Sequence, residues 1–208
     1  FNRNLLLNWL DLSNNELEEI ESKVFSDMKN LWNLNLNLNK VRKIARDAFS
    51  GSTRLLHLEL SNNLLETIEP EWFQDLIKLR GLLLDGNKIK IIGARTFDKL
   101  ENLKDLVLKN NEVSQIDEHA FAGLTTLEEL LLDGNQLSKL PQNVFYDLPN
   151  LKKLVLARNN LETIDIALFE RFTNLNELNL EANKIKELPA DFSANLKGIR
   201  GLDLGKNQ

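Results

Sequence analysis

Residues 127–150 read LEELLLDGNQLSKLPQNVFYDLPN, and these 24 residues contain the pattern that the whole chain repeats. The pattern is LxxLxLxxNxLxxLxxxxFxxL, beginning at Leu127. A fixed period of roughly 20–50 residues indicates a repeat solenoid, in which each repeat packs against its neighbours. The first position recurs every 24 residues, at Leu7, Leu31, Leu55, Leu79, Leu103, Leu127, Leu151 and Leu175, with Ile199 in the ninth place.

The start of each repeat predicts a short strand. Leu130 and Leu132 alternate with Glu129, Leu131 and Asp133, and alternate residues of a strand face opposite sides of a sheet. We therefore expect each repeat to add one parallel strand to a sheet on the concave side of the solenoid.

Two further columns are interpreted as structural. Asparagine has amide donors and a carbonyl acceptor, so in a buried turn it satisfies backbone groups of its own repeat and the next one. A phenylalanine recurs later in each repeat, and Phe192 comes one residue early, which predicts a local rearrangement of the convex loop. The columns are Asn15, Asn39, Asn63, Asn87, Asn111, Asn135, Asn159, Asn183 and Asn207, and Phe25, Phe49, Phe73, Phe97, Phe121, Phe145 and Phe169.

Because these columns recur in phase over nearly the whole chain, the sequence resembles the leucine-rich repeat family. It is similar to the 24-residue class common in animal extracellular proteins, with wording like that of invertebrate members. The resemblance implies an α/β fold, a right-handed curved solenoid with a parallel sheet inside and irregular or short helical segments outside. Only about 13 residues separate the asparagine turn from the next strand, too few for a long helix. The resemblance also implies protein recognition, by a cell-surface receptor, an adhesion molecule or a secreted innate-immune protein.

We interpret residues 1–208 as a single domain, with eight complete repeats over residues 7–198 and partial repeats at both ends. Phe1 lies 24 residues before Phe25, in the phenylalanine position of an incomplete repeat, and Gln208 follows Asn207. Neither end contains the polar cap that covers the core of a solenoid. We therefore expect a segment of a longer chain. The alternative is that end-to-end association, or further residues, cover the two ends.

Composition bounds the partner and the compartment. The chain is 42% hydrophobic and 27% charged, with a net charge of −5, which argues against nucleic-acid binding because such surfaces are basic. No apolar run reaches the ~20 residues of a membrane span, so we expect no direct membrane contact from this segment. Cysteine and Asn-x-Ser/Thr sequences are both absent, which weakens the case for secretion. The repeat class still favours an extracellular location, with the cytoplasm as the alternative.

The residues give no indication of an enzyme, a cofactor or a metal site. Without cysteine there is no thiol nucleophile, and His57 and His119 are more than two repeats apart. No phosphate-binding loop, HExxH or GxSxG sequence is present. Asp85 and Asp133 each begin an Asp-Gly-Asn sequence, which is typical of turns.

The outward-facing residue at mid-strand is the most informative free position. It is apolar in four consecutive repeats, at Leu83, Val107, Leu131 and Val155, and polar on both sides of them. Because parallel strands lie about 4.8 Å apart, this apolar stripe should be about 15 Å long. An exposed apolar patch with a polar rim is typical of a binding site. Aliphatic ladders also stabilise sheets without any ligand, so both interpretations stay open.

Charged columns flank the apolar stripe, and we predict that Lys104, Glu128, Glu129 and Lys153 form its rim. Neighbours of opposite sign, such as Lys104 and Glu128, should largely neutralise one another. Where a partner covers the stripe, these charges would set specificity and association rate more than affinity.

A second candidate surface lies near the amino end, where Trp9 and Trp32 occupy free positions on adjacent strands and His57 follows on the next. Exposed tryptophan often anchors an interface. The alternative is that these rings cover the end of the core. The predicted partner is a protein ligand or co-receptor. The alternatives are a homodimer, a structural scaffold that spaces other domains, and an intracellular adaptor.

Overall fold

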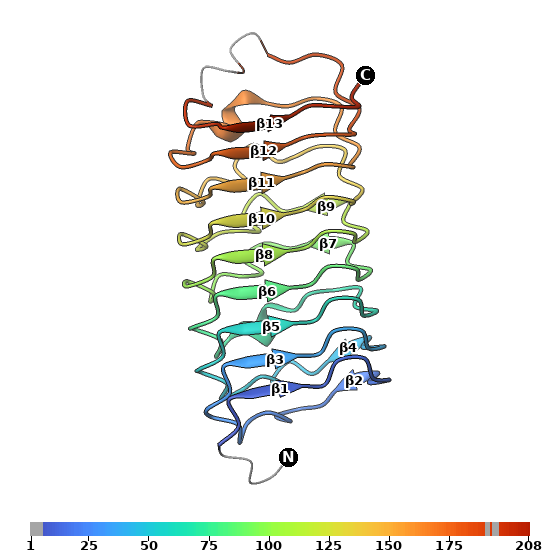
Figure 1. Ribbon diagram of the computed structural model, residues 1–208, viewed down its shortest axis with the longest axis vertical. Coiled ribbons are helices and arrows are strands. Elements are labelled where there is room, and N and C mark those ends of the chain that lie inside the picture. Colours follow the sequence, from blue (N-terminus) through green and yellow to red (C-terminus); the bar gives the residue numbers. More distant parts are fainter. Residues whose placement is uncertain (1–5, 190–191, 193–195) are drawn as a thin grey trace.

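The computed structural model describes residues 6–189, 192 and 196–208. Within these residues the chain winds into a column of coils, and one strand from each coil joins a nine-stranded parallel sheet (Figure 1). The strands in sheet order are β1 (Trp9–Asp11), β3 (Asn33–Asn35), β5 (His57–Glu59), β6 (Gly81–Leu83), β8 (Asp105–Val107), β10 (Glu129–Leu131), β11 (Lys153–Val155), β12 (Glu177–Asn179) and β13 (Gly201–Asp203).

Residues 24 positions apart lie opposite one another on neighbouring strands of this sheet. Leu130 of β10 is paired with Leu106 of β8 and with Leu154 of β11. All three leucines are fully buried, whereas Leu131 is half-buried. The 24-residue period therefore stacks each core leucine on its equivalents, which confirms the predicted parallel strands and solenoid.

The phenylalanine column packs inside the convex side of the coils. Phe97 and Phe121 stack with ring centroids 6.2 Å apart, and Phe121 and Phe145 follow at 6.3 Å. Sequence reasoning missed Phe172, whose ring contacts both Phe145 at 5.9 Å and Phe169 at 6.1 Å. An extra aromatic ring thus enters the column where the 24-residue pattern has none.

The two irregular phenylalanines of the sequence are only partly covered by the structure. Phe192 is buried and meets Phe169 edge-on at 6.1 Å. The rearrangement predicted for its loop lies largely outside the described residues, because residues 190–191 and 193–195 are not among them. Phe1 also lies outside them.

Regular helix is scarce in the described part of the chain. The helices there are two short 3₁₀ turns, η1 (Pro70–Phe73) and η2 (Ile166–Phe169), so the helical component of the α/β class amounts to these. None of the described helices is long and apolar enough to cross a membrane.

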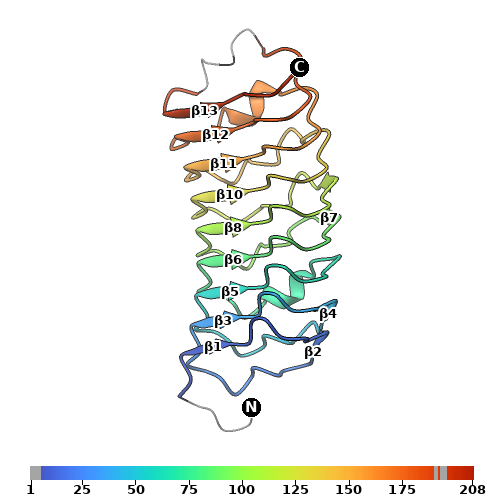
Figure 2. The same cartoon turned by 45° about the vertical axis from the view of Figure 1, so that its right-hand side comes forward.

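Two small sheets on the far side of the coils were not anticipated. β2 (Glu19–Ile20) pairs with β4 (Lys43–Ile44), and β7 (Ile91–Ile92) pairs with β9 (Gln115–Ile116). Figures 1 and 2 place these pairs on the side of the column away from the large sheet. The available signal was a column of buried isoleucines, since the second residue of each of these strands is an isoleucine in the same position of the repeat.

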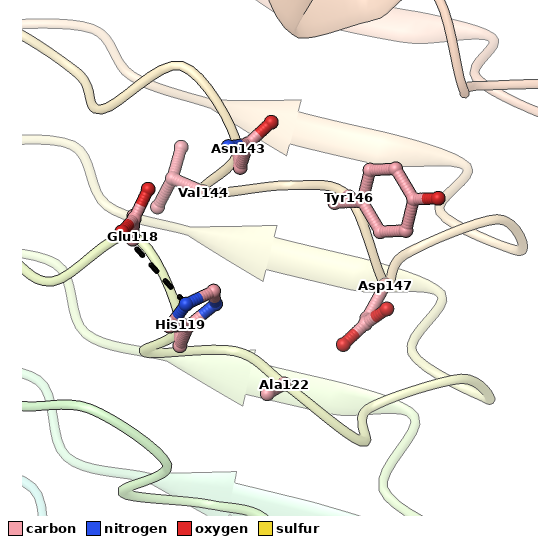
Figure 3. A pocket seen from close by; sticks show the side chains of 7 residues that line it. All are labelled: Glu118, His119, Ala122, Asn143, Val144, Tyr146 and Asp147. Carbon is pink, nitrogen blue, oxygen red and sulfur yellow. Dashed lines mark ion pairs between the residues drawn. The ribbon is translucent and has the colours of Figure 1, made fainter.

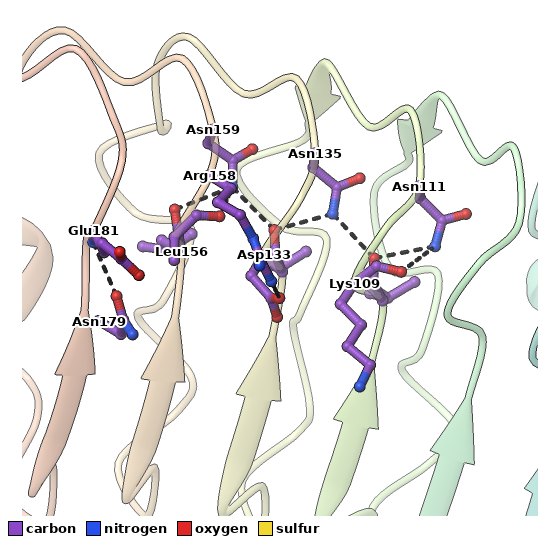
Figure 4. A network of polar contacts seen from close by, with 12 residues as sticks. Lys109, Asn111, Asp133, Asn135, Leu156, Arg158, Asn159, Asn179 and Glu181 are labelled. Carbon is purple, nitrogen blue, oxygen red and sulfur yellow. Dashed lines mark hydrogen bonds and ion pairs between the residues drawn. The ribbon is translucent and has the colours of Figure 1, made fainter. Parts of the chain in front are cut away.

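The asparagine column forms a ladder of hydrogen bonds between coils (Figure 4). Asn135 donates to the carbonyls of Leu132 in its own repeat and of Leu108 in the preceding one, each at 3.0 Å. Its Oδ1 accepts from the backbone N–H of Val113, at 2.9 Å. The prediction that these asparagines satisfy buried backbone groups is correct, but its direction was wrong. The bonds reach the preceding repeat, because the turn of one repeat lies directly over the loop that leaves the previous turn.

The residue before each of these asparagines adopts a left-handed backbone. All nine have positive φ, and the column is Asn14, Leu38, Asn62, Gly86, Asn110, Gly134, Arg158, Ala182 and Lys206. Glycine and asparagine tolerate this conformation, whereas a leucine there is strained. The turn is therefore imposed by the packed coil even where the local residue opposes it.

Candidate protein-binding surface

The apolar stripe runs across four neighbouring strands of the large sheet. Leu83 lies opposite Val107, Val107 opposite Leu131, and Leu131 opposite Val155. All four side chains are half-buried. The structure therefore brings these sequence-predicted residues together as one continuous apolar surface on the sheet face.

Polar residues close the stripe at both of its ends. Glu59 of β5 is paired with Leu83, and Asn179 of β12 is paired with Val155. Glu59 is itself held by hydrogen bonds, since Asn37 donates to its Oε2 at 2.8 Å. The apolar area is thus bounded along the sheet by polar side chains, of which Glu59 has a fixed partner.

The column of Lys104, Glu128 and Lys152 is self-neutralising, as the sequence suggested. The Glu128 carboxylate accepts from Lys104 at 2.7 Å and from Lys152 at 2.5 Å. These two hydrogen bonds lower the pKa of the Glu128 carboxyl to about 2. Glu128 therefore stays ionised down to strongly acidic pH, and its charge is already matched by two cations.

The inner rim is less completely paired. Lys153 bonds to Glu177 at 2.9 Å, and this hydrogen bond raises the pKa of Lys153. Glu129 lies directly opposite Asp105 on the next strand. Burial raises the pKa of the Asp105 carboxyl, and the nearby charge of Glu128 raises it further. Among the described residues neither Asp105 nor Glu129 has an ion-pair partner, so this part of the rim is locally negative.

Asp105 is a rim residue that the sequence-based selection left out. It stands one strand from Glu129 in the same column, so the 24-residue period alone places it there. Its half-buried carboxylate lies next to the apolar stripe, which makes it as much a rim residue as Glu129 or Lys153.

The tryptophan surface is separate from the apolar stripe. Trp9 and Trp32 are 55% and 44% exposed, so both rings are accessible in this chain. Trp9 is in β1, and Trp32 precedes β3, with its backbone N–H donating to the carbonyl of Asn8 at 2.8 Å. The polar residue Glu59 stands between this region and the stripe. Two distinct surfaces therefore share the sheet face.

His57 belongs to neither surface entirely. Its imidazole lies over Gly81 on the next strand, where a Cβ would come within 2.7 Å of Nδ1. Glycine in the interior of a strand often allows a close approach of another group, and here that group is the histidine ring. The histidine thus fills the space between the tryptophans and Asp105.

Histidine and carboxylate chemistry is dispersed over the molecule. His57 is on the large sheet, whereas His119 lies in the loop after β9, beside Asp117. In the part of the chain that the structure describes, no group of three or more His, Cys, Asp or Glu side chains is placed to hold a metal ion. Asp133 is tied to Arg158 at 2.7 Å in a contact between turns (Figure 4), which supports its interpretation as a turn residue.

The described geometry has the pattern of one protein family. Leucine rich repeat family models match residues 33–89, 77–137 and 125–185, and a further one matches residues 6–28. The chain therefore belongs to the leucine-rich repeat family, whose members typically mediate protein–protein recognition. No curated protein matches this chain.

Solved structures with the same fold include proteins of different kinds. The crystal structure of a TLR13–ssRNA13 complex matches with a TM-score of 0.90 and 32% identity, over 95% of this chain and 29% of that one. A leucine-rich repeat protein of Leptospira interrogans matches with a TM-score of 0.84 and 31% identity, over 96% of this chain and 49% of that one. The chain thus spans less than half the length of either protein.

Proposed function

We propose that this chain is a protein-recognition segment of an extracellular leucine-rich repeat protein, and that the apolar stripe is the centre of its binding surface. The observation that carries the proposal is the half-buried, continuous ladder of Leu83, Val107, Leu131 and Val155. A receptor of innate immunity or adhesion is the form that we favour, and the resemblance to TLR13 supports it. The partner is a protein ligand or a co-receptor.

The geometry gives the stripe the organisation of an interface. An apolar centre contributes affinity once water is excluded from it, and a polar rim contributes specificity. The rim here combines matched charges, such as Glu128 between its two lysines, with the unmatched Asp105 and Glu129. A complementary partner would therefore place apolar side chains against the stripe and positive charge near these two carboxylates.

The test replaces Val107 and Leu131 with glutamate. Both side chains face outward, so the variant should fold, while two buried charges in the complex should weaken binding by several kcal/mol. The matched control is Asn35→Glu with Asn179→Glu, which adds the same two charges in the same column outside the stripe. Binding is measured for the folded variants against the natural partner, identified by pull-down with the full-length protein. Normal binding by the V107E/L131E variant would show that the stripe is only a sheet ladder.

The rim has a different expected effect. Lys153→Glu should lower mainly the association rate and change its salt dependence, because rim charges steer the encounter. Stopped-flow association at two ionic strengths separates this from a loss of affinity through faster dissociation.

A scaffold is the second candidate function, favoured by the exposed tryptophans at one end of the sheet. In that case the chain should self-associate through Trp9 and Trp32, and sedimentation of a Trp9→Ser/Trp32→Ser variant should show a loss of dimer. TLR13 forms a complex with a single-stranded RNA. The net charge of −5 gives no support to RNA binding by this chain, because surfaces that bind nucleic acid are basic.

A further inference from the structure

A pocket of about 260 Å³ opens on the convex side of the coils, away from the large sheet (Figure 3). Sites for drug-sized ligands measure roughly 300–1,000 Å³, so this pocket suits a single side chain or a small molecule. It arises from a step between two repeats. Ala122 follows Phe121, whereas Tyr146 follows Phe145 in the equivalent position, and a small residue beside a large one leaves a hollow.

Tyr146 forms one wall of this pocket, and its ring is held from behind. The side chain is 54% exposed. The Arg171 guanidinium lies 4.4 Å from the ring centroid, and its Nη2 donates to the Tyr146 hydroxyl at 3.1 Å. Arg171 lines a different hollow, on the side of the following repeat, and does not line this pocket. The ring is therefore fixed in place while its other side borders the pocket.

The remaining lining is apolar at the base and anionic at the edges. Ala122 and the buried Val144 supply the apolar part. Glu118 and Asp147 supply two carboxylates from opposite walls (Figure 3). The nearest partner of Glu118 is His119 at 3.8 Å, which is positive only when protonated. Among the described residues Asp147 has no hydrogen-bond or ion-pair partner.

The charge balance of the pocket is consequently one-sided. No lysine or arginine lines it, and the one arginine close by is engaged by the Tyr146 ring. A cation is attracted to the face of an aromatic ring and to carboxylates, and an aliphatic stem gains by covering apolar surface. The pocket offers these three features together in a volume suited to one side chain.

We propose that this pocket binds the side chain of a lysine or arginine presented by a polypeptide partner. The stem lies against Ala122 and Val144, and the cationic group reaches Tyr146 and Asp147. The site is on the opposite side of the coil from the apolar stripe, so the proposal stands independently of the proposed function. It would give the protein a second contact surface, free while the sheet face is occupied.

The experiment titrates the folded 208-residue chain with small probes and follows its backbone amide signals by NMR. The probes are the N-acetyl methylamides of lysine and arginine, the same derivative of norleucine as a neutral stem of similar length, and cadaverine as a free amine. We expect the lysine and arginine probes to shift the signals of Ala122, Tyr146 and Asp147, and the norleucine probe to shift them far less. Equal shifts from norleucine, or no shift from either cationic probe, would overturn the proposal. Shifts from cadaverine alone would overturn a peptide-borne ligand.

Variants separate the pocket from the general surface. Ala122→Leu fills the hollow and should abolish the shifts. Asp147→Asn, which leaves the shape unchanged, should weaken binding about two- to fivefold, the range for one exposed ion pair. Asp27→Asn is the matched control, because Asp27 occupies the same position after Phe25 as Asp147 does after Phe145. Binding that survives both Ala122→Leu and Asp147→Asn would show that the cations bind elsewhere.

Discussion

At the scale of single residues, the sheet separates neighbours in the chain into two environments. Leu132 is fully buried, while the adjacent Leu131 is half-buried and faces out of the sheet. Leu132→Ala should lower the free energy of unfolding by ~2–5 kcal/mol, because it removes core contacts and leaves a cavity. Leu131→Ala should lower it by under about 1 kcal/mol. Denaturant melts of both variants check this, and equal losses would contradict the register.

Another residue-scale prediction concerns the left-handed column. Leu38 has φ of 55° and is 55% exposed, so it suffers backbone strain without burying its side chain. Leu38→Asn should therefore raise the free energy of unfolding by up to about 1 kcal/mol, since asparagine tolerates this conformation better. Thermal melts provide the measurement.

Gly86 occupies the same column and gives the contrasting control. A Cβ there would lie 2.4 Å from Oδ1 of Asn62 in the preceding repeat, at a φ of 66°. Gly86→Ala should therefore destabilise the chain. A stabilising Gly86→Ala together with a destabilising Leu38→Asn would show that left-handed strain does not govern this turn.

At the scale of the repeat, the asparagine ladder connects each coil to the one before it. Asn135→Ala leaves the buried N–H of Val113 without its side-chain acceptor. The carbonyls of Leu108 and Leu132 each keep a second asparagine, so they lose only one of two bonds. The expected loss is ~1–3 kcal/mol, the cost of one buried unsatisfied group. Urea melts provide the measurement.

Asn15 is the natural comparison for this ladder. Its side chain is exposed and donates only to carbonyls of its own repeat. Asn15→Ala should therefore cost under about 1 kcal/mol in the same urea melts. A loss as large as that of Asn135→Ala would mean that the bond between repeats is not what stabilises the turn.

At the scale of the whole molecule, stability should vary along the solenoid. Each repeat contacts only its neighbours, so a strand with one neighbour opens more easily than a strand between two. Leu12 and Leu204 are only partly buried, whereas Leu108 and Leu132 are fully buried. Hydrogen exchange should show weak protection of amides near the first pair and strong protection near the second. Uniform protection would instead indicate that the ends are covered by self-association.

The architecture of this protein could be predicted from its amino-acid sequence. Because every repeat has the same length, the period of 24 residues places each residue beside its equivalents, and the alternation around Leu130 decides which side chains enter the core. The continuity of the apolar stripe and the pairing of Lys104 with Glu128 could be predicted for the same reason. That these residues bind a partner stays a prediction.

The choice of contacts among neighbouring side chains required the folded structure. The period brings Asp147 and Arg171 to equivalent positions of adjacent repeats, which favours an ion pair, yet Arg171 lies over Tyr146 and leaves Asp147 without a partner among the described residues. The asparagines bond backward along the solenoid, and Phe172 enters a column in which the pattern has no place for it. A repeat specifies which backbones are adjacent, but rotamers and local loop shape select among contacts that differ by only a few ångströms.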